Sequence, residues 1–425
     1  MRHSMKSLLI LALLLPAVSS PGQIAAGKDK FLGNIIANGY SPPALFDTYW
    51  NQVTPENSGK WGSVEGTRNQ MNWGSLDKIY EYAKQREIPF RMHTLVWGQQ
   101  QPGWIASLSR EQQLEEVEEW IAEFGDRFPE TDFIDVVNEP LHAPPSYMNA
   151  LGGSGSTGWD WVIRAFELAR AACPDAKLHL NDYGILNDNG ATTRYLVIVN
   201  LLKDRGLIDG ICEQGHFFES TSTQTLTSNL NRFAAVGLPV YITEHDVNIA
   251  NDTSQLNRYK QLFPVFWGHS AVQGVTLWGY IQGQIWRTDS WLINSKGVER
   301  PAMEWLKDYV ANETAVDAGP EGPGSAPGRF KLHPNSPNPF NPSTRIAFEL
   351  TEPAQVRIEV FDLKGRTVAV PVNGRTAAGF HEAAWDARDR SGRGLPGGVY
   401  VYRMTVADGN GGILPVQSRT MLLLK

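Results

Sequence analysis

Two glutamates follow short apolar runs of the kind that form buried strands. Asn138 and Glu139 come directly after Ile134–Val137, and Glu244 comes directly after Val240–Ile242. A buried carboxylate costs free energy unless it is paired. One such glutamate could be a structural ion-pair partner, but two at the ends of different strands favour a chemical role.

Paired carboxyl groups are the requirement for cleaving a glycosidic bond. One is protonated and expels the leaving oxygen, while the other is ionised and attacks the anomeric carbon or activates water. A separation of about 5 to 5.5 Å gives retention of configuration, and a wider one gives inversion. The sequence therefore indicates a sugar-cleaving centre around Glu139 and Glu244.

Side-chain alternation brings further polar groups to this centre. Residues two apart on a strand share a face, so Glu244 and Asp246 point the same way, as do Gln214 and His216. A chain from Asp246 through His216 to Glu244 would keep a nucleophile ionised, although His216 could instead be a satisfied core histidine. His245 faces the other way, and we expect no catalytic role for it.

His93 and Trp97 can share one side of another strand. A metal site built from His93, His216 and carboxylates is an alternative, but a sugar site uses the same residue types without a metal. We expect no metal and no cofactor.

Sugar rings present apolar faces that stack on indole, and polar groups beside them bind the hydroxyls. Three tryptophans and three polar residues fit these roles, although the tryptophans could be core residues and the two charged groups could form a surface pair. The candidates are Trp97, Trp278, Trp286, Glu56, Asn57 and Lys60.

Short apolar or β-branched runs alternate with helical patterns such as residues 114–128 and 159–172. Eight such repeats over roughly 290 residues predict a (β/α)8 TIM barrel, with its active site at the carboxyl ends of the strands. A doubly wound sheet is the alternative, but no glycine-rich phosphate loop follows the first strand. The eight runs begin at Phe31, Gln52, Phe90, Asp132, Lys177, Gly210, Pro239 and Gly274.

Charge and cysteine content exclude several classes of protein. The 425 residues carry a formal net charge of −7 without a basic run, which argues against a nucleic-acid partner and favours a neutral substrate. Cys173 and Cys212 are the two cysteines, and we expect both to be buried thiols.

The chain divides into four parts. Residues 1–22 resemble a signal peptide, with a basic start, an apolar run and small residues, so we expect a secreted or cell-surface protein. Residues 23–314 form the predicted barrel, and residues 315–329 are a Pro/Gly linker. Residues 330–425 read as short alternating strands, which predicts a small all-β Ig-like sandwich.

Seven ordered motifs across residues 25–313 resemble glycoside hydrolase family 10: TPENSGKW, HTLVW, DVVNEP, LNDYG, EQGH, ITEHD and TLWGY. The resemblance implies a retaining endo-β-1,4-xylanase acting on xylan, with Glu139 as acid/base and Glu244 as nucleophile. We expect the protein to be a monomer. It places the polar and aromatic candidates above in the sugar subsites, with Asn138 on the 2-hydroxyl of the reacting sugar. Asp246 and Tyr183 are expected to support the site.

The sequence departs from the common family pattern after TLWG. Many relatives continue with an aspartate and a Ser-Trp pair, whereas this chain reads YIQGQIWRTDSWL and resembles a separate branch of the family. A second departure is His245, where many relatives have leucine. The reaction is expected to be unaffected, and the binding of the leaving-group sugars to differ.

The C-terminal segment resembles the Ig-like sorting modules of type IX secretion cargo and the flagellar hook-capping Ig-like domain, through NSPNPFNPSTRIAFEL and GLPGGVYVYRM. The resemblance implies export or surface attachment. Its aromatics Trp385, Tyr400 and Tyr402 are expected to pack in the core rather than to bind polysaccharide. Two rivals to the main interpretation are a β-1,4-glucan or mixed-linkage glucan hydrolase and a non-catalytic polysaccharide binder.

Overall fold

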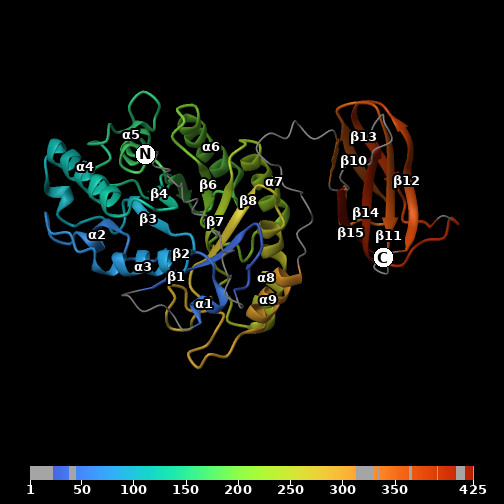
Figure 1. Cartoon of the computed structure of the whole chain (residues 1–425), viewed down its shortest axis with the longest axis horizontal. Coiled ribbons are helices and arrows are strands. Elements are labelled where there is room, and N and C mark those ends of the chain that lie inside the picture. The colour runs from blue at the N-terminus through green and yellow to red at the C-terminus, as the bar shows by residue number, and fades with distance from the viewer. Residues whose placement is uncertain are drawn as a thin grey trace, which may run out of the picture. The chain divides into compact units, whose positions relative to one another are not determined.

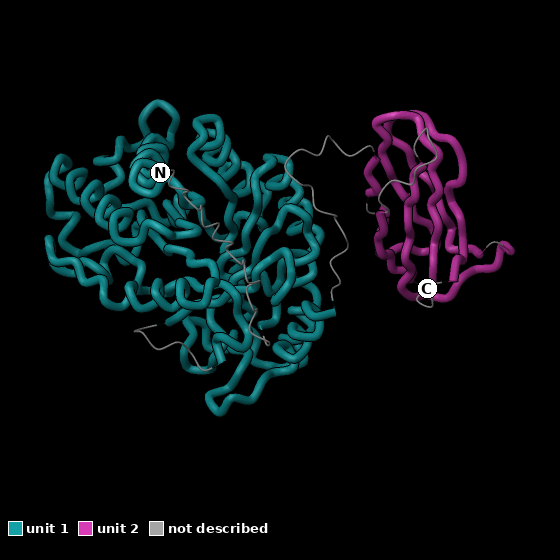
Figure 2. Tube along the Cα trace, viewed as in Figure 1, with its two compact units in different colours: residues 1–312 teal, residues 313–425 magenta. Residues whose placement is uncertain are grey.

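The computed structural model divides the chain into two compact units, residues 1–312 and 313–425, which are described separately (Figure 2). It describes residues 23–37, 45–312, 330–333, 335–362, 366–389, 391–407 and 417–424. The predicted signal peptide, residues 1–22, and the predicted linker, residues 315–329, lie outside the described residues.

Eight parallel strands form the centre of the first unit (Figure 1). They pair in the order β2-β1-β8-β7-β6-β5-β4-β3, and a parallel bridge between Val53 and Phe90 joins β2 to the start of β3. The sheet therefore closes, which confirms the predicted barrel and excludes the open doubly wound sheet. The strands are β1 (Phe31–Ile36), β2 (Val53–Pro55), β3 (Arg91–Val96), β4 (Phe133–Asn138), β5 (Lys177–Asp182), β6 (Gly210–Glu213), β7 (Val240–His245) and β8 (Val272–Leu277).

Helices surround these strands (Figure 1) and bury one apolar face each against them. In α4 the buried face includes Val117, Trp120 and Phe124, and a capping box of Ser109 and Gln112 begins the helix. The helices are α1 (Phe46–Tyr49), α2 (Trp61–Val64), α3 (Gly74–Gln85), α4 (Arg110–Arg127), α5 (Asp160–Ala172), α6 (Asn189–Lys203), α7 (Thr223–Ala234), α8 (Asp252–Trp267) and α9 (Pro301–Asn312).

The barrel interior is filled by side chains. At its amino-terminal end the rings of Phe31 and Tyr241 stack with centroids 5.9 Å apart. Gly274 makes room for them, because a Cβ there would lie 2.2 Å from the Phe31 ring. Cys173 and Cys212 are both buried and unbridged, which confirms the expectation of two thiols.

The second unit consists of two antiparallel sheets, ordered β13-β10-β9 and β12-β11-β14-β15, which confirms the predicted β-sandwich. Trp385, Tyr400 and Tyr402 are buried among its apolar residues, so they pack in the core, as predicted. The strands are β9 (Phe330–Leu332), β10 (Thr344–Leu350), β11 (Ala354–Phe361), β12 (Thr367–Thr376), β13 (Gly379–Trp385), β14 (Gly398–Ala407) and β15 (Gln417–Leu423).

Within the ranges that the structure describes, no helix has the length and apolar character needed to cross a bilayer.

Candidate active site

The predicted site residues meet at the carboxyl ends of the barrel strands. Asn138 ends β4 and Glu139 follows it, while Glu244 lies near the end of β7. Glu139 has a left-handed backbone with φ of 55°, a conformation that a non-glycine residue adopts only when its surroundings hold it. Its amide donates to the Asn181 carbonyl at 2.8 Å, which fixes the turn after β4.

The carboxyl group of Glu139 is held by two side-chain donors. Trp97 Nε1 donates to Oε2 at 3.0 Å, and Gln214 Nε2 donates to Oε1 at 3.1 Å. Burial raises the pKa of Glu139, and the nearby charge of Glu244 raises it further, while the two donors oppose the rise. The pKa remains above its ordinary value, so this carboxyl group retains a proton more readily than a free glutamic acid.

Glu244 is surrounded by donors and cations. Asn181 Nδ2 donates to Oε1 at 2.8 Å, and His216 Nε2 lies 3.3 Å from Oε2. Burial alone would raise the pKa of Glu244, but the positive charge of His93 and the hydrogen bond from His216 outweigh it and leave the pKa below its ordinary value. This carboxyl group therefore loses its proton more readily than a free glutamic acid.

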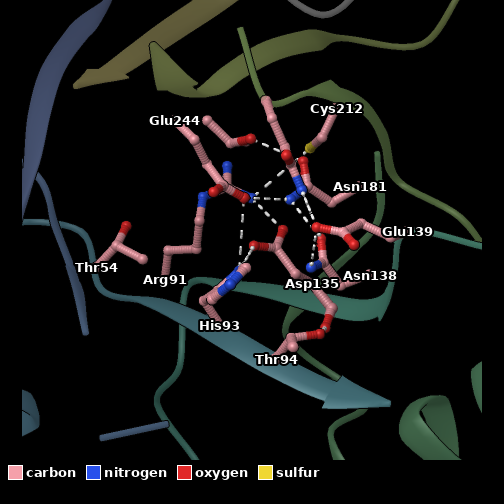
Figure 3. Close-up of polar contacts among 12 residues, drawn as sticks. Thr54, Arg91, His93, Thr94, Asp135, Asn138, Glu139, Asn181, Cys212 and Glu244 are labelled. Carbon is pink, nitrogen blue, oxygen red and sulfur yellow. Dashed lines mark hydrogen bonds and ion pairs between the residues drawn. The ribbon is translucent and has the colours of Figure 1, made fainter. Parts of the chain in front are cut away.

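Amide side chains connect the two carboxyl groups (Figure 3). Asn181 Nδ2 donates to Asn138 Oδ1 at 2.9 Å as well as to Glu244. Gln214 Nε2 donates to Asn138 Oδ1 at 3.2 Å as well as to Glu139. Asn138 thus accepts from both amides, and its own Nδ2 points to Glu139 at 3.4 Å. These bonds fix the two carboxyl groups relative to each other.

The predicted chain from Asp246 through His216 to Glu244 is present. His216 Nδ1 lies 3.0 Å from Asp246 Oδ2. Burial alone would lower the pKa of His216, but the carboxylates of Asp246 and Glu244 outweigh it and raise the pKa to about 10, which keeps the imidazole charged. Asp246 also accepts from Trp286 Nε1 at 3.0 Å and from Arg287 at 2.6 Å.

His245 points away from this centre, as expected. It is buried outside the barrel interior, its Nδ1 lies 3.1 Å from the Gly215 carbonyl oxygen, and its ring packs against Tyr259 and Phe266.

His93 lies beside Glu244 at the mouth of the barrel. Its Nδ1 is 3.1 Å from Asp135 Oδ2 and 3.9 Å from Glu244 Oε1. The indole of Trp278 packs edge-on against the His93 ring with centroids 5.2 Å apart. Trp278 is buried, whereas Trp286 is 48% exposed, so the two tryptophans differ in how much of the indole solvent can reach.

The three polar residues after β2 lie near the same mouth. Lys60 donates to Asn57 Oδ1 at 3.2 Å and to Gln100 Oε1 at 2.8 Å, and its Nζ lies 5.0 Å from the Trp97 ring centroid. Lys60 is buried, so the alternative of a surface pair between Glu56 and Lys60 is wrong. Burial raises the pKa of Glu56, although the charges of Lys60 and His93 oppose the rise.

Tyr183, which was predicted to support the site, follows β5. Its ring stacks on His142 with centroids 4.0 Å apart and contacts Phe217 edge-on at 5.9 Å. His142 Nδ1 is held 2.7 Å from Asp182 Oδ1. Burial raises the pKa of Tyr183, and the charges of Glu139 and Asp182 raise it further.

Asn181 and Arg287 were not predicted, although both contact the charged centre. The sequence held a signal for Asn181, because this residue lies near the end of a strand and shares a face with His179. Arg287 lies in the loop after β8, where no periodicity indicates which way a side chain points.

Asp135, His179 and Cys212 form the one group of three metal-type ligands among the described residues. The guanidinium of Arg91 occupies their midst, with Nη1 at 2.6 Å from Asp135 Oδ1, 3.0 Å from His179 Nδ1 and 3.7 Å from Cys212 Sγ. A permanent cation already neutralises this group.

The model of glycosyl hydrolase family 10 matches residues 22–309, and that of the FlgD Ig-like domain matches residues 335–410. Endo-1,4-beta-xylanase B of Cellvibrio japonicus is 43% identical over 288 residues, covering 67% of this chain and 46% of the relative. The chain thus spans less than half the length of that relative. A beta-1,4-xylanase of Dictyoglomus thermophilum is 31% identical, covering 61% of this chain and 80% of the relative.

Two solved structures share the fold. Native xylanase 10B of Thermotoga maritima superposes with a TM-score of 0.61 at 26% identity, covering 68% of this chain and 97% of that one. Xylanase 10B of Thermotoga petrophila in complex with xylobiose superposes with a TM-score of 0.61 at 25% identity, covering 67% and 94%.

Proposed function

Because the chain belongs to glycosyl hydrolase family 10, we propose that it is a secreted enzyme that hydrolyses internal β-1,4 bonds of xylan with retention of anomeric configuration. One observation carries the chemistry. The environments of two neighbouring carboxyl groups push their pKa values apart, upward for Glu139 and downward for Glu244. That separation supports Glu139 as the acid and Glu244 as the nucleophile.

The reaction then proceeds in two displacements. Glu244 attacks the anomeric carbon while Glu139 gives its proton to the leaving oxygen, which yields a covalent glycosyl-enzyme and a shortened sugar chain. Glu139, now ionised, removes a proton from water, and the resulting hydroxide displaces Glu244 with a second inversion. The hydrogen bond from Gln214 to Glu139 and that from His216 to Glu244 hold both groups in place during the steps.

The substrate assignment draws on the relatives and on the lining of the site. Both relatives named above are xylanases, and one of the structural neighbours holds xylobiose. In this chain the exposed face of Trp286 offers stacking to a pyranose ring, and Lys60, Asn57 and Gln100 offer donors and acceptors to its hydroxyls.

The proposal also covers where the protein acts and what the second unit does. The leader-like residues 1–22 support secretion, and the match of residues 335–410 to an Ig-like module supports a role in export or attachment to the cell surface. All the residues assigned to chemistry precede residue 313, so we propose that a monomeric barrel acts alone.

The test compares matched xylo- and cello-oligosaccharides and follows the first product by proton NMR. We expect a higher kcat/KM on xylohexaose than on cellohexaose, internal cleavage, and β-anomeric product at early times. Higher efficiency on cellohexaose would favour the glucanase alternative. Absence of turnover on both would favour a non-catalytic binder, and α-anomeric product would refute retention.

A further inference from the structure

A buried arginine is connected to the proposed nucleophile through an aspartate and a histidine. Arg91 and His93 are two residues apart on β3, and Asp135 pairs with His93 on the neighbouring strand β4. All three side chains are fully or almost fully buried. Figure 3 shows them together with Glu244.

Asp135 joins the arginine to the histidine. Its Oδ1 accepts from Arg91 Nη1 at 2.6 Å, and its Oδ2 lies 3.1 Å from His93 Nδ1. The same His93 nitrogen is 3.9 Å from Glu244 Oε1. Because that nitrogen faces two carboxylates, it carries a hydrogen and donates it to Asp135, which orients the ring beside Glu244.

This arrangement is costly for stability. Arg91 Nε and Nη2 are buried without a hydrogen-bond partner in the protein, and a well-packed apolar side chain of similar volume is often as stable as a buried ion pair. The pair therefore needs a reason other than packing. Its position, one histidine away from Glu244, supplies one.

The titratable side chains around Glu244 show which charge Arg91 balances. On the cationic side they are Lys60, His93 and His216. On the acidic side they are Glu56, Asp135, Asp246 and Glu139, the last of which holds its proton as the proposed acid, while the thiol of Cys212 is neutral. Without Arg91, the unpaired charge of Asp135 would act on Glu244 through the low-dielectric interior.

We propose that Arg91 is a positioning residue for the reaction: it fixes Asp135 and balances its charge, so that Asp135 orients His93 without repelling an ionised Glu244. Arg91 touches neither substrate nor the reacting atoms. The proposal rests on the proposed function, because it takes Glu244 as the nucleophile.

The test measures kcat/KM against pH on dinitrophenyl xylobioside, whose leaving group needs no protonation. The acidic limb of that profile then reports the ionisation of Glu244 in the free enzyme. Arg91→Met removes the cation, so the limb should move to higher pH by about 1 unit. Asp135→Asn removes the anion but keeps an acceptor for His93, so the limb should move to lower pH.

Two further variants separate charge from packing. Arg91→Lys keeps the charge, and Arg91→Met combined with Asp135→Asn removes both charges, so each should return the limb close to that of the wild type. Thr276→Val is the matched control, because it breaks a buried bond of 2.7 Å to Gln52 inside the same barrel. It should lower the melting temperature without moving the limb.

Opposite shifts in the two single variants would support the proposal, since loss of packing alone moves no pKa in a direction set by charge. If Arg91→Met fails to fold, Asp135→Asn and the double variant still decide. Shifts in the same direction, or a limb unmoved in folded Asp135→Asn, would overturn it. Absence of wild-type turnover on this glycoside would instead refute the proposed function.

Discussion

The buried ion pair between Asp246 and His216, next to Glu244, leads to a quantitative prediction for Asp246→Asn. Asp246 Oδ2 lies 3.0 Å from His216 Nδ1, and both side chains are almost fully buried, at 2% and 4% exposure. Removing one partner of a buried pair costs about 3 to 5 kcal/mol. Asparagine keeps one oxygen that can accept from both His216 and Trp286, so we expect a loss near the lower end of this range, about 3 kcal/mol in the free energy of unfolding at pH 6.

The loss should depend on pH in a defined direction. The pKa of His216 is raised from 6.5 to about 10 in the folded protein. A group whose pKa is raised by folding contributes stability that is complete below its unfolded pKa and disappears as the pH rises through its folded pKa. The difference in stability between the wild type and Asp246→Asn should therefore shrink steadily between pH 6.5 and 10.

Urea unfolding followed by tryptophan fluorescence at pH 6, 8 and 9.5 measures this difference. Asp77→Asn is the matched control, because Asp77 forms a partly exposed pair with Arg127 at 2.7 Å. Its replacement should cost less than about 1 kcal/mol. A cost for Asp246→Asn that stays constant from pH 6 to 9.5 would refute the reasoning that His216 is charged by this pair.

Three further predictions follow from the site and the two units. Glu139→Ala should keep rapid glycosylation by dinitrophenyl xylobioside but slow deglycosylation, so a pre-steady-state burst of dinitrophenol should appear. Equal losses of activity on substrates with good and poor leaving groups would contradict the acid/base role. Asn181→Ala removes the 2.8 Å bond to Glu244 and the 2.9 Å bond to Asn138, so kcat should fall about 100-fold while circular dichroism shows a folded protein. A loss of kcat below threefold would show that the amide does not position the nucleophile. A chain ending at residue 318 should retain almost full activity on soluble xylan, because the barrel residues form a compact unit of their own. A large loss of activity in a folded truncated protein would show that both units are needed.

The fold was predictable because its signals are repetitive. Each of the eight apolar runs contains or overlaps an observed strand, and β1 has the predicted bounds of Phe31 to Ile36. Alternation also indicated the facing directions of Glu244, Asp246 and His245. These inferences need only the period of a strand, which the sequence carries directly.

The contacts within the site were less predictable. Alternation shows that Asn181 faces inward but not that its amide reaches Glu244, because the partner depends on register and on barrel curvature. The same holds for Arg91, whose partners come from β4, β5 and β6. Arg287 lies in a loop, so no periodic sequence pattern indicates its contact with Asp246.

The central claim is that Glu244 forms a covalent intermediate, and trapping that intermediate tests it most directly. Dinitrophenyl 2-deoxy-2-fluoro-β-xylobioside should release one equivalent of dinitrophenol and leave the enzyme heavier by one fluoroxylobiosyl group. Peptide mapping by mass spectrometry should place the label on Glu244, within the peptide that contains Ile242 to Asp246. A label on any other residue, or turnover of the natural substrate without any trapped adduct, would contradict the assignment.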